Sequence, residues 1–106
     1  MTEQSQLGPS ENATVMLDIG GDIGALIITT TKAMLLAEIE VSHVDADPHA
    51  HRPHVAVRER RGPDGLQYAA IYPGLPSGEY TVWGLDGQPA DKVYILGGEV
   101  AHLDWR

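Results

Sequence analysis

The sequence predicts a single all-β domain that folds as an antiparallel sandwich of about seven strands. Short runs of apolar and β-branched residues are separated by turn residues, as at Gly20-Gly21 and Gly62-Pro63-Asp64-Gly65. No stretch has the convincing 3.6-residue apolar period that an amphipathic helix needs. The length of 106 residues is enough for one hydrophobic core and too short for two.

Residues 1–12 are polar and contain the pair Gly8-Pro9, so we expect a disordered tail there and the sandwich domain at 13–106. Within the domain, the pattern predicts strands at 13–19, 22–30, 37–44, 54–61, 66–72, 78–84, 92–96 and 99–105. These are eight segments, so a sandwich of seven strands requires one pair to be a single bent strand. For residues 32–38 the sequence leaves open a short helix or a strand.

The turn at 62–65 predicts that 54–61 and 66–72 pair as a hairpin, because proline presets φ and glycine tolerates positive φ. We also expect 37–44 to pair with 54–61. That pairing would place Glu38 opposite Arg60 and Glu40 opposite Arg58, and opposite charges across strands are stabilising. It is the simpler explanation for the arginines, and an anion-binding patch at Arg58 and Arg60 is the alternative.

One segment of the chain has a local signature. The run Tyr-Pro-Gly-Leu-Pro-Ser-Gly-Glu-Tyr-Thr-Val-Trp at 72–83 resembles a signature of prealbumin-like sandwiches, the group that includes the carboxypeptidase regulatory-like domains. In that signature a leucine, a turn of small residues and Gly-x-Tyr-x-Val lead into a core strand, here Leu75, Gly78, Tyr80 and Val82. The resemblance implies Greek-key connections. We expect Gly78 to allow a tight entry, and Tyr80 to bury its ring while its hydroxyl bonds to the backbone.

A longer stretch, 17–105, resembles a group of small, standalone, uncharacterised bacterial proteins. The shared runs include Gly-Gly-Asp-Ile-Gly-Ala-Leu and His-Val-Ala-Val-Arg-Glu-Arg. This group implies no activity. The channel residues of the thyroid-hormone carrier and the active-site motifs of the hydroxyisourate hydrolases, which share the prealbumin-like fold, do not match here. The resemblance therefore implies a fold and leaves the function open.

The composition argues against several classes of partner. With 15 acidic and 7 basic residues the formal charge is −8, which disfavours binding to nucleic acids and to anionic membrane surfaces. The absence of cysteine excludes disulfides and thiolate zinc sites. The first residues have neither a basic nor an apolar signal region, so we expect a cytoplasmic protein.

The strongest cluster of chemically active side chains is a histidine-rich stretch at 45–54. It contains the potential metal ligands Asp45, Asp47, His49, His51 and His54. Imidazoles and carboxylates at this density could bind a divalent transition metal such as Zn²⁺. Against this hypothesis, Arg52 would repel a dication. A solvated loop is the simpler interpretation, and a pH-sensitive interface is a third.

Two further features are candidates for a site. Trp83 alternates away from Tyr80 and Val82, so it should point outward, where it could stack on a sugar or anchor a partner unless a loop at 86–91 covers it. His102 and Asp104 share one face of the last strand and could form an oriented imidazole, but a surface polar pair is the simpler interpretation.

The function favoured by these observations is a non-enzymatic binding or interaction module that self-associates, as a homodimer through an edge strand. The first alternative is a metal-binding protein, with possible hydrolytic activity, that uses His49, His51 and His54. The second alternative is a carbohydrate-binding module that uses Trp83. The ligand candidates outside the histidine loop are Trp83, Arg58 and Arg60.

Overall fold

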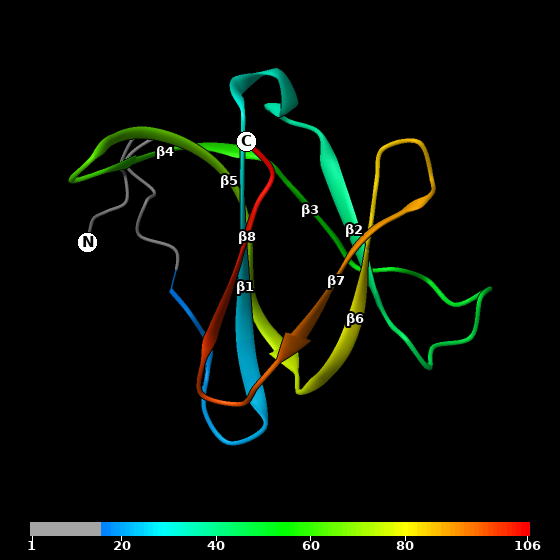
Figure 1. Cartoon of the computed structure of the whole chain (residues 1–106). Coiled ribbons are helices and arrows are strands. Elements are labelled where there is room, and N and C mark those ends of the chain that lie inside the picture. Colours follow the sequence, from blue (N-terminus) through cyan, green and yellow to red (C-terminus); the bar gives the residue numbers. More distant parts are fainter. Residues whose placement is uncertain (1–15) are drawn as a thin grey trace.

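The computed structural model describes residues 16–106, which form eight strands and one short 3-10 helix in two packed sheets (Figure 1). The elements are β1 (Ile23–Thr30), η2 (Lys32–Met34), β2 (Glu38–His43), β3 (His54–Ala56), β4 (Arg58–Gly62), β5 (Gly65–Pro76), β6 (Gly78–Trp83), β7 (Pro89–Ile95) and β8 (Val100–Asp104). The prediction of an all-β sandwich is confirmed. Among the described residues no helix is long and apolar enough to cross a membrane.

The first sheet has the strand order β4-β5-β1-β8. β1 is central and pairs antiparallel with β5, for example Ile28 with Ala70. On its other side β1 pairs with β8, and this pair is parallel, with Ala25 opposite Val100. The expectation of a wholly antiparallel sandwich is therefore wrong at this edge. The chain reaches β8 from the opposite sheet, so the direction of β8 is not imposed by a hairpin with β1.

The second sheet has the order β3-β2-β6-β7 and is antiparallel throughout. The β2–β6 pair places Glu40 opposite Trp83 and Ser42 opposite Thr81. In Figure 1 the connection between β2 and β3, residues 44–53, projects from the right-hand side of the molecule beside this sheet. This connection and the outer face of the second sheet form the candidate site described below.

The core lies between the two sheets and is mainly aliphatic. Along each strand every second side chain points into the core, as the period of two requires. Its fully buried members are Leu26, Ile28, Ile39, Val41, Val57, Ala70, Val82 and Ile95, with Tyr72, Leu75 and Tyr80 close to fully buried. Trp105 packs against this cluster and donates its indole N–H to Asp91 Oδ2 over 3.3 Å. Since Trp105 follows β8 and Asp91 lies on β7, the bond links the two sheets.

The predicted strand 54–61 is in fact two strands that belong to different sheets. β3 ends at Ala56, β4 begins at Arg58, and Val57 between them is fully buried in the core. The Val57 amide donates to the Ala37 carbonyl, and its own carbonyl accepts the Leu36 amide, both over 2.9 Å. These bonds hold the chain where it crosses from one sheet to the other.

This crossing makes the predicted charge pairing wrong. Glu38 lies opposite Ala56 and Glu40 opposite His54, not opposite the arginines. Arg58 and Arg60 instead face Ala69 and Gln67 of β5, in the other sheet. The hairpin between β4 and β5 is confirmed, with Gly62 paired to Gly65 across the predicted turn.

Other boundaries also differ from the predictions. The tail at 1–12 and the first part of the predicted strand 13–19 lie outside the described residues, and residues 16–19 are not in a strand. In the stretch 32–38, Lys32–Met34 is a single 3-10 turn. β5 runs on to Pro76, and β7 begins at Pro89, earlier than the predicted residue 92. Both extensions contain proline, at Pro73 and Pro76 in β5 and at Pro89 in β7, which is uncommon inside strands.

The corner that leads into β6 has the expected construction. Tyr80 is buried, and its hydroxyl donates to the Pro76 carbonyl over 2.7 Å. Gly78 has φ +144°, which disfavours any residue with a side chain, and an added Cβ would overlap Nε2 of His43. The His43 ring packs edge-on against Tyr80 with centroids 5.1 Å apart. Gly78 is thus required by both its backbone conformation and the imidazole beside it.

Tyr72→Phe is expected to lower the free energy of unfolding by about 1–2 kcal/mol. The buried Tyr72 hydroxyl donates to the carbonyl of Ile39 on β2 and lies 3.2 Å from the carbonyl of Pro53, just before β3. Burial also raises the pKa of Tyr72 well above its ordinary range. Urea denaturation measures the change. The control Tyr94→Phe removes a hydroxyl from a ring that is 63% exposed and should change stability by less than about 0.5 kcal/mol. Equal effects would contradict the role given to the Tyr72 hydroxyl.

Candidate functional site

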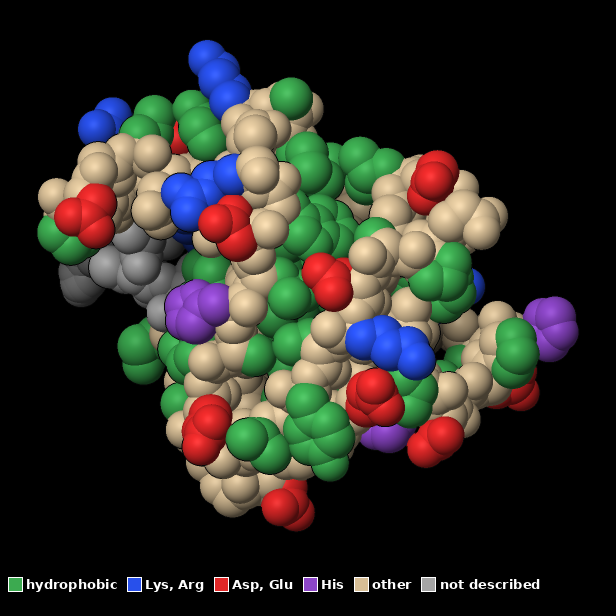
Figure 2. All heavy atoms as spheres, in the orientation of Figure 1, with side chains coloured by type: hydrophobic (Ala, Val, Ile, Leu, Met, Phe, Trp, Pro, Cys, Tyr) green, Lys and Arg blue, Asp and Glu red, His purple; other side chains and the backbone are tan. Residues whose placement is uncertain are grey.

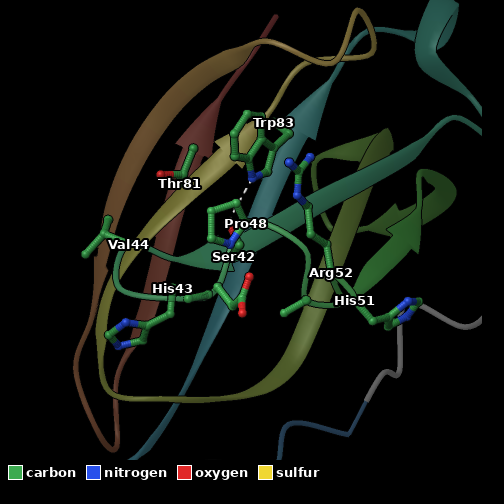
Figure 3. A pocket seen from close by; sticks show the side chains of 11 residues that line it. Ser42, His43, Val44, Pro48, His51, Arg52, Thr81 and Trp83 are labelled. Carbon is green, nitrogen blue, oxygen red and sulfur yellow. Dashed lines mark hydrogen bonds between the residues drawn. The ribbon is translucent and has the colours of Figure 1, made fainter.

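A cavity of about 280 Å³ lies between the outer face of the second sheet and the 44–53 connection (Figure 3). Strands β2 and β6 provide one wall and the connection provides the other. The residues that line it are Ser42, His43, Val44, Ala46, Asp47, Pro48, Ala50, His51, Arg52, Thr81 and Trp83. Alternation explains the sheet wall, because Ser42, Thr81 and Trp83 point away from the core that Val41 and Val82 enter.

Arg52 and Trp83 form the most specific contact of the cavity. The Arg52 guanidinium carbon lies 3.7 Å from the centroid of the Trp83 ring, a cation–π geometry. The same guanidinium donates from Nη1 to Oε1 of Glu40 over 3.1 Å. In Figure 3 the Arg52 side chain runs from the connection up beside the indole. Arg52 thus joins the connection to the sheet through one aromatic and one acidic side chain.

The indole of Trp83 is also fixed at its polar edge. Its N–H donates to Ser42 Oγ over 2.9 Å. Ser42 lies on the neighbouring strand, so the bond spans β2 and β6. The outward orientation expected for Trp83 agrees with this arrangement, and the side chain that covers it is Arg52, whereas the sequence suggested a loop at 86–91. The Trp83 ring is half-buried, and its hydrogen bond to Ser42 fixes its orientation.

The 44–53 connection is ordered by its own hydrogen bonds. The Ala46 amide donates to the His43 carbonyl and the Ala50 amide to the Asp47 carbonyl, both over 2.9 Å. Asp47 Oδ1 accepts the His49 amide over 2.8 Å. At the far end the Pro53 carbonyl accepts the Val41 amide over 3.1 Å. The connection is therefore a pair of turns anchored at both ends, and it can hold one wall of a binding site in place.

Of the predicted metal ligands, the structure brings His51 and His54 near each other but forms no group of three among the described residues. The His51 and His54 rings are 6.0 Å apart between centroids, and His54 Nε2 lies 3.8 Å from Glu38 Oε1. Across residues 16–106 there is no group of three or more histidine, cysteine or acidic side chains that could hold a metal ion. Figure 2 shows the visible histidines spread over the surface instead of gathered at one place. No three of His49, His51, His54, Asp45 and Asp47 therefore form such a group in the described part of the chain, and metal binding by this set stays a prediction.

Arg58 and Arg60 lie on β4, in the sheet that does not contain Trp83. Arg60 and Arg61 contribute to a separate shallow cavity of about 190 Å³ with Ile27, Gln67, Ala69 and Ile71. Burial lowers the pKa of Arg60, and the neighbouring Arg58 acts in the same direction. The three ligand candidates named from the sequence outside the histidine loop therefore belong to two places on the molecule.

His102 and Asp104 point outward from β8, as the alternation predicts. Arg106 engages the Asp104 carboxylate with two side-chain bonds of 2.9 Å. These bonds lower the pKa of Asp104 to about 2. Asp104 is thus paired with Arg106 at the surface, which agrees with the interpretation of His102 and Asp104 as a surface polar pair.

The contacts of Arg52 and Glu40 are not predicted from the sequence. There Arg52 is only a cation that would repel a metal, and Glu40 is a partner for Arg58. The position of Glu40 on the outward face of β2 can be predicted from the alternation. It indicates a contact with Trp83 only when β6 is known to be the neighbouring strand.

No family model, no curated protein and no solved structure matches this chain. The resemblance to prealbumin-like sandwiches therefore stays a prediction.

Proposed function

We propose that the protein is a non-enzymatic binding module whose ligand site is the cavity between the second sheet and the 44–53 connection. The observation that carries this proposal is the Arg52 guanidinium held 3.7 Å from the Trp83 ring at the wall of the cavity. Ligand sites in proteins combine an apolar or aromatic surface with a few fixed polar groups. Here the indole supplies the surface, and Ser42, Thr81 and Asp47 supply polar groups beside it.

Rigidity supports a binding role. The sheet wall is held by the β2–β6 ladder, and the Trp83 ring by its bond to Ser42. A preorganised site loses less conformational entropy when it binds a ligand. Tryptophan and arginine are also the side chains most enriched among residues that dominate binding energy.

A carbohydrate ligand is the second candidate. The Ser42 and Thr81 hydroxyls and the Asp47 carboxylate lie in the same lining as the indole, which suits a polar ring with an apolar face. The Arg52 side chain covers part of the indole, so a sugar would have to share or displace that contact.

The proposal is tested by following the indole N–H signals of the two tryptophans in ¹H–¹⁵N spectra. Trp105→Phe assigns the two signals. The probes are N-acetyl-arginine amide, cellotetraose and citrate at millimolar concentration. We expect at least one probe to shift the Trp83 signal in a saturable way and to leave the Trp105 signal in place. If no probe moves Trp83, or if both signals move together, the proposed site is contradicted.

Self-association through an edge strand remains a separate proposal. The edge strands are β4 and β8 in the first sheet and β3 and β7 in the second. β3 has three residues and β4 carries three arginines and a glutamate, features that discourage pairing. The exposed Tyr94 on β7 and Leu96 just after it make that edge the better candidate for a second copy.

A further inference from the structure

Glu40 and Trp83 together have the two features of a guanidinium-binding site. They lie directly opposite each other on β2 and β6, with both side chains on the outer face of the sheet. A carboxylate binds a guanidinium through its N–H groups, and an indole binds it through its face. Arg52 uses both features, at 3.1 Å to Oε1 of Glu40 and 3.7 Å to the centroid of the Trp83 ring. The pair is therefore a cation site that is filled by a side chain of the same protein.

Arg52 can leave this site without unfolding the connection. Its side chain is 29% exposed and that of Glu40 is 45% exposed, and ion pairs and cation–π contacts at such exposure are weak. The backbone beside it is fixed, because the Pro53 carbonyl accepts the Val41 amide over 3.1 Å. The Tyr72 hydroxyl lies 3.2 Å from the same carbonyl. A rotation of one side chain is then enough to expose the Trp83 face and the Glu40 carboxylate.

The negative charge around the site favours a cationic ligand. Glu38 lies two residues from Glu40 on the same face of β2, and Asp47 lines the adjoining cavity. The whole chain has a formal charge of −8. A surface of this sign attracts basic partners and speeds their association. When Arg52 moves away, Glu40 is left to repel an anion and attract a cation.

We infer that Glu40 and Trp83 bind an arginine side chain of a basic partner protein, and that Arg52 occupies the site until the partner displaces it. The inference rests on the proposed function, since it assigns a partner class to the same site. An internal occupant competes at high effective concentration, so it weakens the apparent affinity of an outside guanidinium. Removal of the Arg52 side chain charge should therefore strengthen binding.

The test is a titration of N-acetyl-arginine amide into the wild type, Arg52→Gln and Arg58→Gln, with the Trp83 indole signal as the readout. We expect Arg52→Gln to bind about 3- to 10-fold more tightly than the wild type, because the internal competitor is gone. Arg58→Gln changes the net charge by the same amount on the other sheet, and it should bind like the wild type. N-acetyl-citrulline amide has a similar shape without the charge and should not bind. The double variant Glu40→Gln/Arg52→Gln should not show the increase in affinity expected for Arg52→Gln alone.

Two results would overturn the inference. The first is that Arg52→Gln binds the arginine probe no more tightly than Arg58→Gln does. The second is that cellotetraose or citrate shifts the Trp83 signal while the arginine probe fails in every variant. In the second case the proposed binding site stands and only its ligand class is wrong. If no probe shifts the Trp83 signal in any variant, both the binding site and the arginine ligand are contradicted. Matching thermal unfolding curves for the variants confirm that they are folded.

Discussion

Gly97→Ala is expected to lower the free energy of unfolding by about 3 kcal/mol or more. Gly97 lies in the connection from β7 in the second sheet to β8 in the first. A Cβ at this position would clash with the Gly21 carbonyl oxygen and lie 2.9 Å from the Asp22 Cα. Both obstacles are backbone atoms of the turn before β1, so no flexible side chain can move aside. Urea denaturation monitored by tryptophan fluorescence measures the loss.

Gly62→Ala is the matched control for this substitution. Gly62 also ends a strand at a turn, but an added Cβ there meets no atom within 4 Å and its φ is not in the left-handed region. The change in stability should be less than about 0.5 kcal/mol, since neither strain nor overlap arises. If Gly97→Ala were tolerated as well as Gly62→Ala, the close approach of the β7–β8 connection to Gly21 would be wrong.

Val57→Asp is expected to destabilise the protein by about 4 kcal/mol or more, or to prevent folding. Val57 is fully buried where the chain crosses between the sheets. An aspartate there would bury a carboxylate among apolar side chains. The milder Val57→Ala should still fold and lose about 2 kcal/mol through the cavity it leaves. Denaturant midpoints measure Val57→Ala, and circular dichroism shows whether Val57→Asp folds.

Val44→Asp provides the comparison. Val44 follows β2 and is 39% exposed, so the same new carboxylate can remain in water. We expect a change of less than about 1 kcal/mol. Equal tolerance of the aspartate at both positions would mean that Val57 does not close the core between the two sheets.

Part of the candidate site could be predicted from local sequence. The period of two places Tyr80 and Val82 inward and Trp83 outward, and the structure has all three side chains in those orientations. The sequence also singles out the 45–54 stretch, although for its histidines. Several of its residues line the cavity, among them His51 and Arg52, and the direction of Arg52 depends on two turns and an anchor at Pro53. A list of ligand types at close spacing contains no information about such directions.

Local sequence is sufficient to predict the strand character of most segments, the β4–β5 hairpin and the buried corner at Tyr80. These features depend on alternation, on turn residues and on contacts between residues close in the chain. The sheet that each strand joins depends on long-range contacts. Examples are the crossing at Val57, the parallel β1–β8 pair and the pairing of Glu40 with Trp83. The physical reason is that an alternating strand buries one face equally well beside several neighbours. The choice among them is made by packing of the whole core and by long-range chain connections, which no local pattern records.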